Sequence, residues 1–140
     1  MKIYLSGAIR GGREFQKNYQ IINDYLKENG YEILTHHVAS PNVLEIEESI
    51  PDVEIYTQDI NWLQECDALI AEVSIPSTGV GYEIAYALTF NKPVLAIYEE
   101  NRIISVMILG NTSPHLTVLS YPSIPRLLSQ IKHFLSSISN

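Results

Sequence analysis

The sequence predicts an α/β protein: a single doubly wound domain, Rossmann- or flavodoxin-like, with a five-stranded parallel sheet and helices on both faces. Short apolar segments alternate with helical patterns along the chain, and right-handed crossovers between such segments give a parallel sheet covered on both sides. Glycine-rich segments follow two of the predicted strands, and sheets of this type bind ligands at the carboxyl ends of their strands. The length of 140 residues fits one domain, spanning residues 1–140, with a substantial core.

The first half of the chain predicts two strands with a helix between them. Residues 2–7 form a short apolar segment that ends at Gly7, and residues 31–37 form a second one. The stretch 14–29 predicts an amphipathic helix, because apolar side chains recur at spacings of four, three and four; these are Phe15, Tyr19, Ile22 and Leu26. Residues 38–52 contain two prolines, several acids and little periodicity. They indicate a long loop with room for a helical turn, and such loops are often lids or binding segments.

The second half continues the alternation of helix and strand. Pro51 can open a helix that runs to about Glu65. The elements expected after it are strands at 68–73, 93–98 and 116–121, a helix at 82–90, a short helix at 104–109, and a last helix from near Pro125 to the end. No internal repeat, low-complexity tract or linker interrupts this pattern, which supports one continuous domain.

Composition and charge narrow the class of function. The hydrophobic fraction of 46% and the charged fraction of 18% are those of an ordinary globular protein. No apolar run approaches the roughly 20 residues that span a bilayer, and the first residues lack the apolar stretch of a secretory signal, so we expect no membrane association. The single cysteine, Cys66, cannot form an internal disulfide, which favours the reducing cytoplasm. A net charge of −7 argues against binding a nucleic acid polymer.

Three positive charges cluster at the first glycine-rich loop, Gly7 to Gly12. Arg10 lies inside the loop, and Arg13 and Lys17 follow it. A cationic spot on an acidic protein suits one small anion, although Arg13 and Lys17 could equally well solvate a helix face. The loop lacks the G-x-G-x-x-G order of a dinucleotide site and the Gly-Lys-Ser/Thr of a P-loop. Its glycines still allow backbone amides to turn toward an anion.

The segment STGVGYEIAYA, residues 77–87, contains a single acid, Glu83. Ser77 or the threonine after it can cap the following helix, and two glycines, Gly79 the first of them, allow the backbone to approach a ligand. Glu83 shares its helix face with apolar residues three or four positions away. A charge at a helix start gains about 0.3–1 kcal/mol from the helix dipole, so a purely structural acid is one interpretation. A desolvated carboxylate that acts as a nucleophile or general base is the other.

Other polar residues allow weaker inferences. Asp59 lies near the boundary of a buried helix face and is either a surface acid or a site residue. His36 and His37 end a predicted strand, but no further ligands stand at the spacing of a zinc site, so we expect no metal. No serine stands in a nucleophile elbow that would suit a Ser-His-Asp triad, and Cys66 is expected in the core.

Three segments carry a resemblance to a known family: residues 2–13 (KIYLSGAIRGGR), 56–98 (YTQDINWLQ through NKPVLAIY) and 102–110 (RIISVMILG). Together they closely resemble the nucleoside 2-deoxyribosyltransferase superfamily, and within it the 2′-deoxynucleoside 5′-monophosphate N-hydrolases. The resemblance covers nearly the whole chain in order. It implies hydrolysis of the N-glycosidic bond of a deoxynucleoside 5′-monophosphate to a free base and deoxyribose 5-phosphate, by a homodimer that needs no cofactor.

The resemblance also implies roles for individual residues. Glu83 would be the nucleophile, Tyr4 would orient its carboxylate, and Asp59 would lie at the sugar and base and help the base to depart. The implied substrate contacts are Gly7, Ile9, Arg10 and Gly11 in the loop that wraps the nucleotide, His37 at the base, Ser77 at the 5′-phosphate with Gly79 beside it, and Ser105 with Met107 from the neighbouring subunit.

Other functions remain open at this point. The same Glu83 could serve a nucleoside 2-deoxyribosyltransferase that exchanges bases, or a CMP-type ribonucleotide N-glycosidase, and the chain could also bind nucleotides without turnover. A transferase for free nucleosides gains little from Arg10, Ser77 and Ser105, so a monophosphate substrate is favoured. Leu109 stands where some relatives carry a basic residue, which leaves the base preference open.

Overall fold

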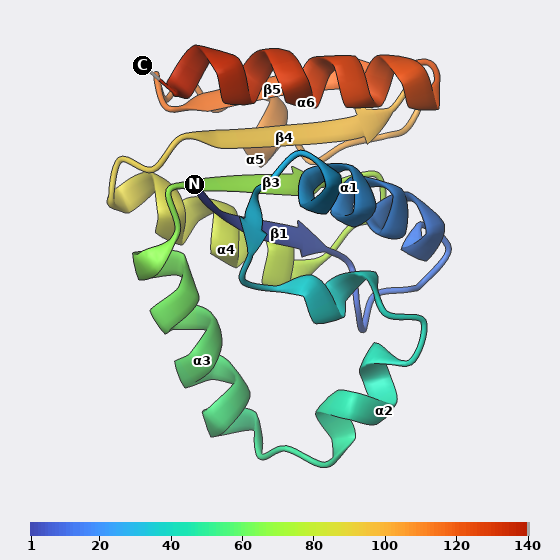
Figure 1. Ribbon diagram of the computed structural model, residues 1–140, viewed down its shortest axis with the longest axis vertical. Helices are drawn as coiled ribbons and strands as arrows, with labels where there is room; N and C mark the ends of the chain where they lie inside the picture. Colours follow the sequence, from blue (N-terminus) through green and yellow to red (C-terminus); the bar gives the residue numbers. More distant parts are fainter. Residues whose placement is uncertain (140) are drawn as a thin grey trace.

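Five parallel strands form the central sheet of the computed structural model, which describes residues 1–139 without the side chain of His36 (Figure 1). The strands are β1 (Lys2–Gly7), β2 (Glu32–Ile33), β3 (Ala68–Glu72), β4 (Val94–Glu99) and β5 (Leu116–Tyr121), and they lie in the order β2-β1-β3-β4-β5. Neighbouring strands pair in parallel throughout. This order is that of a flavodoxin-like, doubly wound sheet, so the predicted fold class is confirmed.

Helices cover both faces of the sheet. In chain order they are α1 (Gln16–Glu28), the 3₁₀ helix η1 (His36–Ala39), α2 (Val43–Glu48), α3 (Asp52–Glu65), α4 (Thr78–Thr89), α5 (Val106–Leu109) and α6 (Ile124–Ile138). On one face, α1 and α6 pack against a core that contains Ile3 and Leu5 of β1. On the other face, α3 and α4 pack against Tyr4, as the alternation of side chains along a strand requires. None of the helices within residues 1–139 combines the length and apolar character needed to cross a bilayer.

The strand order reverses between β1 and β3. The chain passes from β1 through α1 to β2 on one side and then returns to place β3 on the other side of β1. Gly7 at the end of β1 pairs with Glu72 at the end of β3. The loops that follow these two strands therefore leave the sheet side by side, at the position where doubly wound sheets bind their ligands.

The strand predicted at 31–37 is much shorter than expected. Only Glu32–Ile33 pairs with β1, and the following residues form η1. The Thr35 side chain explains this ending, because its hydroxyl accepts from the Leu5 amide (2.8 Å) and donates to the Leu5 carbonyl (2.6 Å). A side chain thus occupies the backbone groups that a continuing strand would have used.

Two helix predictions also need correction. Residues 43–48, expected in a long loop with room for a helical turn, form the six-residue helix α2, and the helix predicted from Tyr82 begins four residues earlier, at Thr78. The Ser77 hydroxyl accepts from the Val80 amide at 3.3 Å and so caps this helix, as expected for a serine at this place. The sequence predicted a loop at the start of α4 because two glycines lie in its first turns and glycine has a low helix propensity.

Candidate active site

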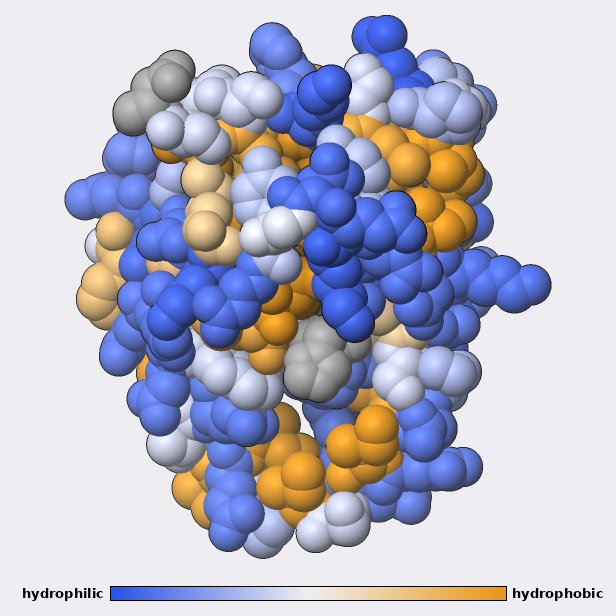
Figure 2. All heavy atoms as spheres, viewed as in Figure 1, coloured by the Kyte–Doolittle hydropathy of each residue, from blue (hydrophilic) through white to orange (hydrophobic). Residues whose placement is uncertain are grey.

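A cleft of about 730 Å³ opens at the carboxyl ends of β1 and β3. The loops after these strands line it, together with η1, α2, α3 and the first turns of α4. In Figure 2 the surface is hollowed between α2 and α3, and apolar side chains border the opening. Ten of the predicted site residues line this cleft: Tyr4, Gly7, Ile9, Arg10, Gly11, His37, Asp59, Ser77, Gly79 and Glu83.

Glu83 lies in the second turn of α4 and points its carboxylate into this cleft. The Tyr4 hydroxyl donates a short hydrogen bond to Oε2, and the Ser6 hydroxyl donates to Oε1 at 3.1 Å. Burial raises the pKa of Glu83 to about 7, and the negative charge of Asp59 adds to this effect, whereas the two hydroxyl donors oppose it. Glu83 is therefore a carboxylate that two donors hold in place, with weak solvation and raised basicity.

Tyr4 is the donor that the resemblance predicted beside Glu83. Its side chain belongs to β1 and is almost completely buried, with 1% of the residue exposed. Burial raises the pKa of the phenol, and the neighbouring Glu83 carboxylate raises it further. The hydroxyl consequently stays protonated at neutral pH and donates to Glu83 whenever that group is ionised.

Ser6 is a site residue that the sequence analysis missed. It lies on β1 two positions after Tyr4, so both side chains point to the same face of the sheet. Since Tyr4 was expected to contact Glu83, this period of two was the signal that could have identified Ser6.

Asp59 is a cleft residue, so its interpretation as a surface acid is wrong. Burial raises its pKa to about 6, and the negative charge of Glu47 contributes. The cleft thus contains two carboxyl groups, Asp59 on α3 and Glu83 on α4, whose pKa values are raised toward neutral pH. Among the residues that the structure describes, no three His, Cys, Asp or Glu side chains are grouped so that they could hold a metal ion.

The two glycine-containing loops touch each other at Gly11. A side chain at this position would bring a Cβ atom within 2.8 Å of the Pro76 carbonyl oxygen, closer than carbon and oxygen tolerate. Glycine therefore allows the loop after β1 to lie directly against the segment that leads to Ser77 and α4.

Arg13 is a structural residue, and neither of its two predicted roles is correct. Its guanidinium donates to the carbonyls of Ala8 (3.0 Å), Val38 (2.9 Å) and Ser40 (2.8 Å). It therefore ties the loop after β1 to η1 and is not available to a ligand. Lys17 lies exposed on α1, as the alternative of a solvated helix face predicts.

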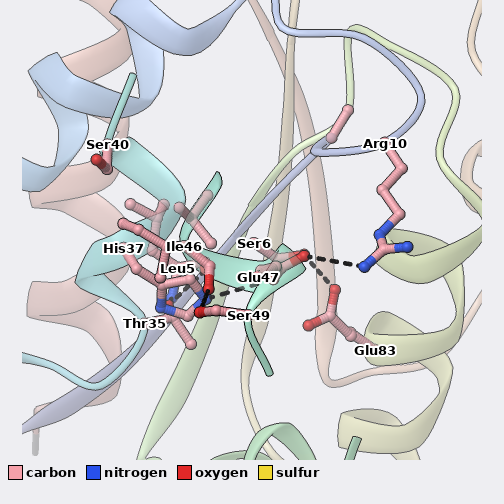
Figure 3. Close-up of polar contacts among 12 residues, drawn as sticks. Leu5, Ser6, Arg10, Thr35, His37, Ser40, Ile46, Glu47, Ser49 and Glu83 are labelled. Carbon is pink, nitrogen blue, oxygen red and sulfur yellow. Dashed lines mark hydrogen bonds and ion pairs between the residues drawn. The ribbon is translucent and has the colours of Figure 1, made fainter. Parts of the chain in front are cut away.

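Arg10 and His37 approach the cleft from different segments and meet at Glu47. Arg10 Nη2 lies 3.7 Å from Glu47 Oε1, and His37 Nε2 lies 3.9 Å from Glu47 Oε2. The His37 ring also lies 5.8 Å from the ring of Trp62 on α3. In Figure 3 the Arg10 guanidinium is directed toward Glu47, with Glu83 close by. Glu47 does not stand out in the sequence, because it lies among several acids in a segment without clear periodicity.

Ser105 and Met107 lie apart from the cleft of their own chain. They line a second groove, of about 570 Å³, between α4 and α5. Ser105 caps α5 by accepting from the Met107 amide at 3.2 Å, and 79% of Met107 is exposed. Within residues 1–139 these are the two predicted substrate contacts that the fold does not bring to Glu83.

A family model for nucleoside 2-deoxyribosyltransferase matches residues 3–117 of the chain. The chain belongs to the nucleoside 2-deoxyribosyltransferase family. This confirms the resemblance found in the sequence. The matched range contains the cleft residues described above, Glu47 included, and also Ser6, which contacts Glu83.

Relatives of known name within this family are similar over most of the chain. A Methanosarcina mazei protein named "Putative 2'-deoxynucleoside 5'-phosphate N-hydrolase 1" is 44% identical over 136 residues, which cover 97% of this chain and 84% of the relative. The 5-hydroxymethyl-dUMP N-hydrolase of Rattus norvegicus is 42% identical over 112 residues, which cover 77% and 68% of the two chains.

A solved structure of another protein has the same fold as this chain. The CMP N-glycosidase of Clostridium botulinum superposes with a TM-score of 0.72, covers 96% of this chain and 99% of its own, and is 19% identical in sequence. At this identity the likeness shows the fold, and it leaves the substrate to be argued from the site.

Proposed function

We propose that the protein hydrolyses the N-glycosidic bond of 2′-deoxynucleoside 5′-monophosphates and releases the base and deoxyribose 5-phosphate. The observation that carries this proposal is the Glu83 carboxylate, which lies in the cleft, accepts from Tyr4 and Ser6, and has a pKa near 7. The names of the relatives at 42–44% identity support the same reaction. The negative charge of the protein and the size of the cleft favour one small nucleotide over a polymer.

In the first step, a Glu83 oxygen attacks C1′ of the sugar while the C1′–N bond breaks and its electron pair leaves with the base. Positive charge builds on the sugar ring, and the carboxylate stabilises this charge and then forms an ester with C1′. Tyr4 and Ser6 keep the attacking group in one orientation. Asp59, on α3, donates its proton to the departing base and becomes ionised, for which a pKa of about 6 is suitable.

In the second step, water attacks C1′ and the bond from C1′ to the Glu83 oxygen breaks. The water oxygen becomes the hydroxyl of deoxyribose 5-phosphate, its proton leaves to a base in the cleft, and Glu83 is again a carboxylate. Asp59, ionised after the first step, is the base that faces this position. The missing 2′-hydroxyl of a deoxy substrate makes the cationic transition state easier to form.

The 5′-phosphate is proposed to lie where the two glycine-containing loops meet. Arg10 supplies positive charge, and Ser77 and Gly79 stand at the amino end of α4, a twelve-residue helix. The amides at such a helix end attract anions. Ile9 and Gly11 complete this wall of the cleft.

We further propose that the protein acts in the cytoplasm as a homodimer, with Ser105 and Met107 reaching the phosphate of the neighbouring subunit. The segment around α5 supports this, because it exposes several large apolar side chains: Ile103 (94%), Val106 (77%), Met107 (79%) and Leu109 (49%). Apolar groups gathered in this way are typical of a surface that another subunit covers.

A second candidate function is base exchange on deoxynucleosides. The family name, nucleoside 2-deoxyribosyltransferase, favours this reaction. The same Glu83 ester would then be opened by a second base. Exchange that is much faster than hydrolysis, without preference for a 5′-phosphate, would establish this reaction.

The direct test is to incubate the protein with each of the four deoxynucleoside monophosphates and to measure the released base. We expect Glu83→Ala to lower the rate by at least about 10³-fold, since it removes the nucleophile. Base release by Glu83→Ala at the wild-type rate would refute the assignment. CMP in place of dCMP tests whether a 2′-hydroxyl is tolerated.

A further inference from the structure

Glu47 is a buried acid on the short helix α2, where Val43 is the other buried residue. Glu47 is 7% exposed, whereas Glu45 and Glu48 on the same helix are exposed to solvent. A carboxylate is costly to remove from water unless a partner of opposite charge compensates it. The burial of this one acid therefore requires an explanation.

The partners of Glu47 come from two other segments of the chain. One oxygen, Oε1, lies 3.7 Å from Arg10 in the loop after β1, and the other, Oε2, lies 3.9 Å from His37 in η1. The carboxylate thus bridges two groups that are far apart in sequence, and Figure 3 shows it between them. It lines the same cleft as Glu83 and Asp59.

A partner that orders the Arg10 side chain in advance lowers the entropic cost of ligand binding. The Arg10 side chain is 64% exposed, and a free arginine loses considerable rotamer entropy when it is ordered. Arg13 fixes the backbone of the loop through the Ala8 carbonyl. The direction of the Arg10 side chain is set separately, by Glu47.

We propose that Glu47 is a positioning residue, which holds Arg10 and His37 at the cleft before the substrate binds. Arg10 is then already directed at the anionic end of the substrate, and His37 at the base. The identity of that substrate rests on the proposed function, whereas the bridge itself rests on the geometry. Its charge also reaches Asp59, whose pKa it helps to raise.

The test is a double-mutant cycle with Glu47→Gln and Arg10→Ala. Glu47→Gln keeps the shape of the side chain and removes its charge, and Glu47→Asp keeps the charge. Glu48→Gln is the matched control, because it makes the same change of charge at an exposed position of the same helix. Thermal unfolding of every variant checks that the fold is intact.

With dGMP as substrate, we expect Glu47→Gln to raise KM by about 3–10-fold. It should lower kcat by a smaller factor, because the pKa of Asp59 falls when the charge of Glu47 is removed. The same substitution in the Arg10→Ala background should change KM by a clearly smaller factor, because of the two partners of Glu47 only His37 is left. Glu47→Asp should recover part of the loss, and Glu48→Gln should behave as the wild type.

Equal effects of Glu47→Gln in both backgrounds would overturn the proposal. A fall in KM would also overturn it, since that is expected if Glu47 merely competes with phosphate for Arg10. If the wild type releases no base from any deoxynucleotide, the proposed function fails. The same cycle is then measured as the Kd of dGMP by calorimetry, where coupling still supports the bridge and additivity still refutes it.

Discussion

Glu83 is subject to two opposing influences on its carboxyl group. Burial raises its pKa to about 7, while the hydroxyls of Tyr4 and Ser6 favour the ionised form. As a result, the Glu83 carboxyl group is ionised in about half of the molecules at pH 7, although it is poorly solvated. Such a carboxylate is more reactive toward a developing sugar cation than one in water. In the proposed role of nucleophile Glu83 must be ionised, so activity is expected to fall as the pH drops below 7.

Replacement of Tyr4 by Phe tests the role of the phenol. The hydroxyl stabilises the ionised form of Glu83, so its removal raises the pKa of that group further above its ordinary value. We expect the acid limb of the pH profile of kcat/KM to move to higher pH, by about 0.5–1 unit. The phosphate of the substrate also titrates near pH 6, but it does so equally for both proteins. An acid limb that stays in place, or moves to lower pH, would refute this role.

The raised pKa of Glu83 also predicts a cost in stability. The ordinary value is 4.5 and the value in the folded protein is about 7, so between these pH values the folded chain holds a proton that the unfolded chain has lost. Stability contributed by this group therefore falls as the pH rises from 4.5 to 7. Glu83→Gln should raise the free energy of unfolding by roughly 1–3 kcal/mol at pH 8 and have little effect at pH 5. Denaturant unfolding at both pH values measures this, and an equal effect at both would contradict it.

The elements of the fold differ in how far the sequence determines them. The apolar runs of β3, β4 and β5 and the periodicity of α1 were sufficient, since buried strands and amphipathic helices depend on local patterns. The short length of β2 was not predictable from a local pattern. It depends on the Thr35 hydroxyl, which bonds the backbone amide and carbonyl of Leu5, thirty positions earlier in the chain. The site followed a similar division. Glu83 stands out as one acid in an apolar stretch, whereas the partners of Glu47 appear only when three distant segments meet.

The start of α4 stabilises the helix and is proposed to bind the phosphate of the substrate, and substitutions at Ser77 separate the two roles. Ser77→Ala should lower stability by about 1 kcal/mol because the helix cap is lost. Asn and Asp are good caps and should retain the stability. Asp also places a negative charge where the phosphate is proposed to lie, so Ser77→Asp should raise KM for dGMP well above that of Ser77→Asn. Equal KM values for the two would indicate that the phosphate lies elsewhere. Thermal unfolding and steady-state kinetics measure both effects.

In the whole molecule, the proposed dimer explains why Ser105 and Met107 lie outside the cleft of their own chain. Each site would take Glu83 from one subunit and Ser105 from the other. The groove between α4 and α5 and its exposed apolar residues would then lie at or near the interface. A composite site of this kind makes activity depend on the pairing of subunits.

Mixing two inactive variants tests this arrangement. In a dimer of one Glu83→Ala chain and one Ser105→Ala chain, one site contains both intact residues and the other contains neither. Random exchange of subunits should therefore restore about a quarter of the wild-type activity. Activity no higher than the mean of the two parents would contradict a shared site, and sedimentation of the mixture confirms that dimers have formed.

The most direct observation would be of the ester on Glu83 itself. The protein is mixed with a deoxynucleoside monophosphate, quenched in acid within a single turnover, digested and analysed by mass spectrometry. We expect deoxyribose 5-phosphate to be attached to the peptide that contains Glu83, and no such adduct in Glu83→Gln. Rapid release of base with that peptide unmodified at every time point would show that Glu83 does not act as the nucleophile.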